Sequence, residues 1–219
     1  MSDTLKAARL DFFLVRQYIK SMLLILLYPM IIIVLNKALL NGVSFGICFL
    51  SMTSSYPFTI SEKHGMNRLY GILPVSRKSM VLGRYLYTCI IGLTSLAFFL
   101  LVCPLVLRTL GTAVAPSDIL VTALTGLLLF TVFTVFLLPG FYKFGSIKGR
   151  FFMFIPAVVF IALLALASFG GFESGPVVAA IDGNPLILAV AVVLFCAAAY
   201  ALSISASVRI YRNKDQNND

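Results

Sequence analysis

Few side chains in this sequence have the types and the spacing that catalysis or metal binding requires. The chain contains one histidine and four cysteines. His64 stands alone in a polar stretch, so it makes a poor metal site, and a catalytic histidine needs positioned partners. Cys48, Cys89, Cys103 and Cys196 lack the close spacing of a metal or redox motif, and each falls in an apolar run, where a free cysteine acts as a small apolar residue. We therefore expect no catalytic residue, no metal site and no cofactor bound by this chain.

The motifs of nucleotide binding and hydrolysis are missing from the sequence as well. It has no glycine-rich phosphate loop ending in Gly-Lys-Ser/Thr, no H-E-x-x-H and no G-x-S-x-G. Ion-driven carriers usually keep an ionisable group inside the bilayer, but here Asp118 stands at the edge of an apolar run, and Glu173 and Asp182 lie between two runs. If the protein moves a solute uphill, we expect the energy to come from outside the chain.

The composition indicates which elements must position these residues. Hydrophobic residues make up 60% of the chain and charged residues 11%, which is far from a soluble globular composition. Apolar runs recur at the roughly 20-residue length that a membrane-spanning helix needs, and they are too long and too continuous for barrel strands. We expect an all-α integral membrane protein, a single transmembrane domain over residues 1–219. Its six predicted spans cover about 21–40, 43–60, 85–107, 118–138, 151–170 and 185–207.

The basic residues predict the orientation of these spans. All lysines and arginines except Lys37 and Arg108 fall at the termini or in the connections after spans two and four. Because positive residues accumulate on the cytoplasmic side, we expect a multi-pass protein of the cell membrane with both termini in the cytoplasm. The net charge of +9 then has a topological explanation, and we expect no binding of nucleic acid.

Residues 4–20 have the pattern of an amphipathic helix that precedes the first span. Their basic residues gather on one face of a helix and their apolar residues cover the rest, although Asp11 and Phe13 interrupt the pattern. Such a helix is predicted to lie in the membrane interface with its basic face toward lipid phosphates. A simple membrane anchor and a docking element for a partner remain two alternatives for it.

The stretch SEKHGMNRLYGILPVSRKS, residues 61–79, is charged and contains glycine and proline. Ser61 is predicted to be an N-cap, Glu62 would favour the positive end of a helix, and Gly71 would end it. Ser76 would then cap a second helix that begins near Arg77 and continues as span three. The prediction is a short cytoplasmic helix beneath the membrane, between spans two and three.

The residues from 62 to 84 resemble those of one family, the membrane subunits of ATP-binding-cassette exporters of the ABC-2 type. Members show a glutamate after the second span, then a glycine, then a leucine before P-V-S-R, and a small and a basic residue as span three starts. The matching residues here are Glu62, Gly65, Leu73, Pro74, Val75, Ser76, Arg77, Gly83 and Arg84. Together with six spans and cytoplasmic termini, the resemblance extends over the whole chain.

The resemblance implies a permease subunit of an ATP-driven exporter, without enzyme activity of its own. A cytosolic ABC ATPase subunit would bind the ATP and magnesium, and a second permease subunit would complete a homodimer or heterodimer. Residues 62–71 would be a coupling helix that docks in the ATPase. The implied coupling residues are Glu62, Gly65, Arg68, Pro74 and Arg77. An ordinary positive loop is the alternative for this stretch.

The second span is unusually polar and raises a further question. Its small and hydroxylated residues are those that let membrane helices approach closely. The span would therefore line the translocation path or a dimer seam, or else pack inside one chain. The candidates are Gly42, Gly46, Ser51, Ser54 and Ser55. Pro57 would kink this span, and residues 171–184 would form a re-entrant hairpin or a plain loop.

Two other functions compete with the permease. A membrane-embedded enzyme would need clustered histidine or acidic residues, which the sequence does not supply. A receptor or immunity protein that recruits a cytosolic partner without transport is compatible with the same sequence.

Overall fold

The computed structural model describes residues 3–65, 76–168 and 184–216, and these residues form helices joined by short connections, with no strand among them. The longer helices follow the apolar runs of the sequence. In chain order they are α1 (Asp3–Val15), the 3₁₀ turn η1 (Arg16–Tyr18), α2 (Ile19–Asn36), α3 (Leu39–Thr53), α4 (Tyr56–Lys63), α6 (Arg77–Thr109), α7 (Pro116–Gly149), α8 (Phe151–Ser168) and α10 (Pro185–Gln216). The all-α prediction is confirmed for the described residues.

Five helical segments of the described chain are long and apolar enough to cross a membrane. They are Asp3–Asn36, Leu39–Lys63, Lys78–Thr109, Pro116–Gly149 and Pro185–Asn213. They correspond to five of the six predicted spans, although the first ends at Asn36 rather than at residue 40, so the chain is a multi-pass membrane protein. The other predicted span, 151–170, coincides with the 18-residue helix α8, and the count of six stays a prediction.

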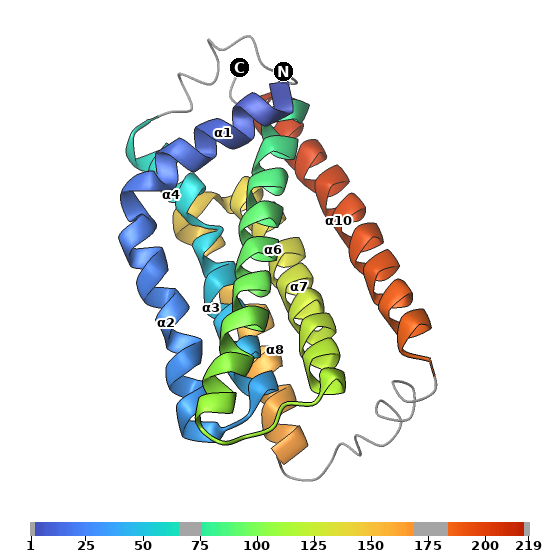
Figure 1. Cartoon of the computed structure of the whole chain (residues 1–219). Helices are drawn as coiled ribbons and strands as arrows, with labels where there is room; N and C mark the ends of the chain where they lie inside the picture. Colours follow the sequence, from blue (N-terminus) through green and yellow to red (C-terminus); the bar gives the residue numbers. More distant parts are fainter. Residues whose placement is uncertain (1–2, 66–75, 169–183, 217–219) are drawn as a thin grey trace.

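The second predicted span forms the centre of the bundle. Its helix α3 packs against α2, α6 and α7 (Figure 1). In the most apolar window of Leu39–Lys63, 67% of the residues are buried inside the protein, against 11% for Pro185–Asn213. The polar second span is therefore the interior helix, and α10 exposes most of its surface.

Pro57 breaks the central span into two helices. Helix α3 ends at Thr53, and α4 begins at Tyr56 with Pro57 in its first turn. Because proline has no N–H, Pro57 cannot donate to the carbonyl of Thr53, four residues earlier. The kink predicted at Pro57 is confirmed as a break at Ser54 and Ser55.

The predicted start of the third span is also confirmed. Ser76 has an extended backbone and its hydroxyl accepts the Ser79 backbone N–H at 3.2 Å. Helix α6 then begins at Arg77. A serine that satisfies one of the free N–H groups of the first turn is the ordinary way to start a helix.

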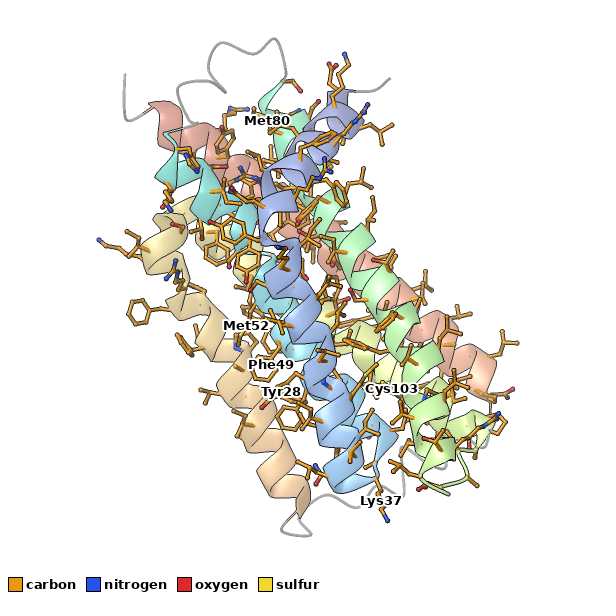
Figure 2. All side chains as sticks on the ribbon, turned by 60° about the vertical axis from the view of Figure 1, so that its left-hand side comes forward. Tyr28, Lys37, Phe49, Met52, Met80 and Cys103 are labelled. Carbon is orange, nitrogen blue, oxygen red and sulfur yellow. The ribbon has the colours of Figure 1, made fainter. Side chains whose placement is uncertain are left out.

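The bundle has two distinct ends. The start of α1, the start of α6 and the end of α10 lie together at the upper end of Figure 1, whereas the α2–α3 and α6–α7 connections lie at the lower end. In Figure 2, Met80 lies near the upper end and Lys37 at the lower end. The segment 4–20 forms α1 from its second residue on, η1 and the first two residues of α2, and α1 crosses α6 at the upper end. Its position at a membrane interface stays a prediction.

Candidate functional site

The residues of the implied coupling segment begin inside α4 rather than after it. Ser61 is not an N-cap: it lies within α4, and its hydroxyl donates to the Pro57 carbonyl at 2.6 Å. The N-cap prediction is wrong because α4 starts at the break before Pro57, and a serine inside a helix satisfies its hydroxyl on the carbonyl of the preceding turn. Glu62 therefore stands in the last turn of α4, near the negative end of the helix.

Helix α4 stops just after Glu62. Its last residue is Lys63, and Gly65 follows with a φ of +59°, a left-handed conformation that suits glycine. Of the other implied coupling residues, Arg77 is the first residue of α6, while Arg68 and Pro74 lie outside the described residues, as does the rest of the segment from residue 66 to residue 75.

The carboxylate of Glu62 contacts a break in another helix. Helix α7 loses helical geometry at Gly145, whose φ is +78° and ψ is −176°. Beyond the break, the backbone N–H of Ser146 donates to Glu62 Oε1 at 2.7 Å, and the Ser146 hydroxyl donates to Glu62 Oε2. A free N–H at the start of a helical turn is usually capped by a neighbouring residue of the same chain segment. Here α4 supplies the cap for the last turn of α7.

Gly145 is required at this contact for two reasons. Its φ and ψ belong to a region that residues other than glycine rarely adopt. In addition, a Cβ at this position would lie 2.6 Å from Glu62 Oε1. The glycine thus allows both the break in α7 and the close approach of the Glu62 carboxylate.

A second contact joins α4 to α1 and α6. Arg84 of α6 places Nε 3.5 Å from Asp11 Oδ2, and its Nη2 donates to the Ser61 hydroxyl at 2.9 Å. The Asp11 side chain is 5% exposed and that of Arg84 13%. The guanidinium also lies 4.2 Å from the centre of the Phe58 ring, which adds a cation–π contact from α4.

The residue before Arg84 explains how α1 comes so near. A Cβ at Gly83 would lie 2.6 Å from Ala7 Cβ and 3.1 Å from the carbonyl oxygen of Thr4. The absence of a side chain at Gly83 lets the two helices cross closely, and Arg84 then reaches the buried Asp11. The small and basic pair at the start of span three holds α1 in place. We refer to Asp11, Ser61, Glu62, Arg84 and Ser146 as the α4 junction.

The candidate residues for a translocation path or a dimer seam are mostly buried within the bundle. A Cβ at Gly42 would collide with Ile33 of α2, and one at Gly46 would collide with Pro29. The Ser51 hydroxyl donates to the Ile47 carbonyl at 2.8 Å, and Ser54 is buried. These are contacts of internal packing, one of the two alternatives for this span. Ser55, at the break, is half-buried and lines a groove described below.

Sequence reasoning missed the partners of these residues. Asp11 was visible as an interruption of the amphipathic pattern, and its buried contact with Arg84 accounts for that interruption. Ser146 lay in a stretch that appeared only as a basic connection. A buried hydroxyl cluster was also missed, in which the Tyr85 hydroxyl is 2.6 Å from Ser203 Oγ and 2.8 Å from Ser207 Oγ. This cluster attaches α10 to α6.

The described residues offer little to catalysis or metal binding. Among them, no three histidine, cysteine or acidic side chains lie close enough together to hold a metal ion. His64 is exposed at the end of α4, and the four cysteines are free thiols. The α4 junction is accordingly a site where helices are held together, and the chemistry it offers is that of ion pairs and hydrogen bonds.

Comparison with known proteins gives one match. The family model described as "ABC-2 family transporter protein" matches residues 9–212, which include every residue of the α4 junction. No curated protein and no solved structure matches the chain.

Proposed function

This chain belongs to the ABC-2 family of transporter proteins, and on that premise we propose that it is the permease subunit of an ATP-driven exporter. The observation that carries the proposal is the match over residues 9–212 to that family, in a chain with five helical segments suited to crossing a membrane. A protein of this kind contributes the path through the membrane and is not itself the catalyst of ATP hydrolysis.

A separate cytosolic ABC ATPase is the proposed source of energy. It would bind ATP and magnesium, for which the sequence has no phosphate-binding loop of its own. The proposed assembly contains two permease subunits, identical or different, and two ATPase subunits. The upper end of the bundle in Figure 1 is called the basic end here, because the start of α1 with Lys6, the start of α6 with Arg77 and the end of α10 with Arg212 lie there. This end would face the cytoplasm and the ATPase. Six spans and an interfacial position for α1 complete the proposed topology.

The α4 junction supports a specific route for coupling. The segment 62–71 is the proposed docking element for the ATPase, and its first residue, Glu62, is hydrogen-bonded to the break in α7. Ser61, its neighbour, is hydrogen-bonded to Arg84, which pairs with Asp11 of α1. A displacement of the docking element would therefore act directly on α7, α6 and α1, because packed helices move as discrete bodies. The direction of the change would be from inward-facing to outward-facing access as the ATPase subunits close.

The first experiment identifies the partner. The protein is tagged at its C-terminus, extracted from its native membrane in mild detergent, and the proteins that remain bound are identified by mass spectrometry. We expect a P-loop ATPase in stoichiometric amount. Its reproducible absence from folded protein would refute the permease assignment and favour a receptor or immunity protein that recruits other partners.

A second experiment tests the coupling route in the assembled complex. Glu62→Arg removes the cap on α7 and places a positive charge against the Ser146 N–H. We expect the variant to insert and to retain the ATPase, while ATP hydrolysis no longer responds to transport. Asp3→Arg is the matched control, because it makes the same charge change at an exposed residue of α1. Equal transport in wild type and Glu62→Arg would refute the route through Glu62.

A further inference from the structure

A groove opens beside the break in the central span. It has a cavity volume of about 400 Å³, within the range of about 300–1,000 Å³ that small-molecule sites commonly have. Its lining residues come from η1 and α2, from α3 and α4 and the break between them, and from Arg150, the residue after α7. Figure 2 labels Phe49 and Met52, two of the lining residues, beside the ribbon of α2.

The lining changes from apolar to polar along the groove. Toward the middle of the bundle it is formed by Ile25, Phe49 and Met52. Toward the basic end the lining consists mainly of hydroxyl-bearing side chains and one cation, with the apolar Ile60 among them. The polar lining residues are Tyr18, Thr53, Ser55, Tyr56, Thr59 and Arg150. An amphiphile with its head at the basic end of the bundle has the same order of groups.

The small hydroxyls already use their hydrogens. Ser55 donates to the Met52 carbonyl at 2.8 Å, and Thr59 donates to the Ser55 carbonyl at 3.1 Å. The hydroxyl oxygens keep their lone pairs, but the donors that an anion needs must come from elsewhere. Arg150 is the cationic lining residue and offers several N–H donors, and the phenolic hydroxyls of Tyr18 and Tyr56 can donate beside it.

Charge complementarity singles out Arg150 further. It is exposed, and the acidic side chains that the structure describes make their contacts elsewhere. Asp3 pairs with Lys6, Asp11 with Arg84, Glu62 contacts Ser146, and Asp118 accepts the Ala115 N–H. No described acidic residue neutralises Arg150 in this groove. A guanidinium next to an apolar channel suits a phosphate that carries an acyl chain.

We infer that this groove binds a phospholipid from the leaflet at the basic end of the bundle. The lipid phosphate is held by Arg150, and one acyl chain lies over Ile25, Phe49 and Met52. An anionic headgroup binds more tightly than a zwitterionic one because it has no ammonium group to oppose the guanidinium. This site is independent of the proposed coupling to an ATPase, since it uses other residues and a lipid that any membrane supplies.

For the test, the full chain is delipidated in mild detergent and titrated with palmitoyl-oleoyl phosphatidylglycerol or with the matching phosphatidylcholine. Native mass spectrometry then counts the lipids bound to each protein molecule. We expect one phosphatidylglycerol to bind more tightly than the others. Arg150→Gln weakens that binding about tenfold, as the loss of a hydrogen bond to a charged group predicts. Lys148→Gln makes the same charge change at an exposed residue outside the groove, and we expect its affinity for phosphatidylglycerol to stay within twofold of the wild type.

A second variant fills the groove without changing charge. Ile25→Trp adds bulk to the half-buried wall, and we expect it to displace both lipids alike. The inference would be overturned if Arg150→Gln and Lys148→Gln lost the same phosphatidylglycerol affinity. It would also be overturned if Ile25→Trp, with unaltered elution on size exclusion, bound lipid as the wild type does. Retention of a second copy of the chain in place of lipid would overturn it as well. Displacement of the lipid by millimolar inorganic phosphate alone would also overturn it, because the acyl chain would then contribute nothing.

Discussion

Gly145→Ala is the most informative single change at the α4 junction. It alters one atom at the break in α7, next to the carboxylate of Glu62. Alanine at a φ of +78° and ψ of −176° carries a backbone strain of about 1–3 kcal/mol. The added Cβ would lie 2.6 Å from Glu62 Oε1, so the carboxylate must leave and both of its hydrogen bonds to Ser146 are lost.

The two costs add to a measurable loss of stability. A hydrogen bond to a charged group contributes about 1.5–3 kcal/mol, and we take the lower value because Glu62 is exposed. With the two bonds of the exposed Glu62 counted together at that lower value and strain near the middle of its range, the free energy of unfolding falls by about 3.5 kcal/mol. For a chain of this size, that corresponds to a decrease in melting temperature of about 7–14 °C.

The cysteines of the chain provide the assay. Cys48, Cys103 and Cys196 are buried and free, so a fluorogenic maleimide reacts with them as the helices separate. Melting curves of the detergent-solubilised wild type and variant then give the shift in midpoint directly. The half-buried Cys89 contributes to the baseline in both proteins alike.

Two further variants separate strain from the loss of the carboxylate. Gly111→Ala is the control for strain, because Gly111 has a φ of +76° and nothing within 4 Å of a Cβ. We expect it to cost about 1–2 kcal/mol. Glu62→Ala removes the same hydrogen bonds, so Gly145→Ala should cost less in its background than in the wild type. Full additivity, or a Gly145→Ala effect no larger than that of Gly111→Ala, would refute the contact.

Two other contacts give predictions by the same assay. Asp11→Ala removes the carboxylate from Arg84, which keeps its contacts with Ser61 and Phe58, and we expect a loss of about 1–3 kcal/mol. Asp3→Ala, at an exposed ion pair, should cost about 0–1 kcal/mol, and equal effects of the two substitutions would contradict the buried pair. Tyr85→Phe removes the hydroxyl that contacts Ser203 and Ser207 of α10, and because Ser203 still donates to the Val135 carbonyl, we expect a cost of about 1–2 kcal/mol. Tyr28→Phe, at a 44% exposed side chain, should leave the midpoint unchanged, and a shift as large as that of Tyr85→Phe would contradict the assignment.

The helices were predictable from the sequence because their causes are local. A long apolar run has few alternatives to a helix in a membrane, and the runs at 21–40 and 185–207 became α2 and α10. Ser76 and Pro57 act on the backbone within four residues of themselves, so the cap of α6 and the break after α3 followed from residue type. The expectation that a serine caps the helix after it was wrong at Ser61, because this serine lies inside α4 and its hydroxyl donates to the Pro57 carbonyl.

The α4 junction was not predictable because its partners are distant in the chain. Glu62 had been singled out, but Ser146 stands in another helix, and no local pattern relates the two. Asp11 and Arg84 meet only because Gly83 lets α1 cross α6. Which side chains meet depends on how helices cross, and the spacing within each helix does not determine that.

The ion pair between Asp11 and Arg84 also constrains the order of biogenesis. Asp11 is synthesised before the first span, whereas Arg84 belongs to the third. Until α6 has entered the bilayer, the carboxylate has no arginine to pair with and is held in water by its hydration, because an unpaired charge is costly to bury. The N-terminal helix must therefore remain at the surface during early translation and dock only after the third hydrophobic segment leaves the translocon. In a nascent chain arrested before Arg84, cysteines placed at Ala8 or Val15 should consequently react with water-soluble labels, whereas both positions are buried in the complete protein.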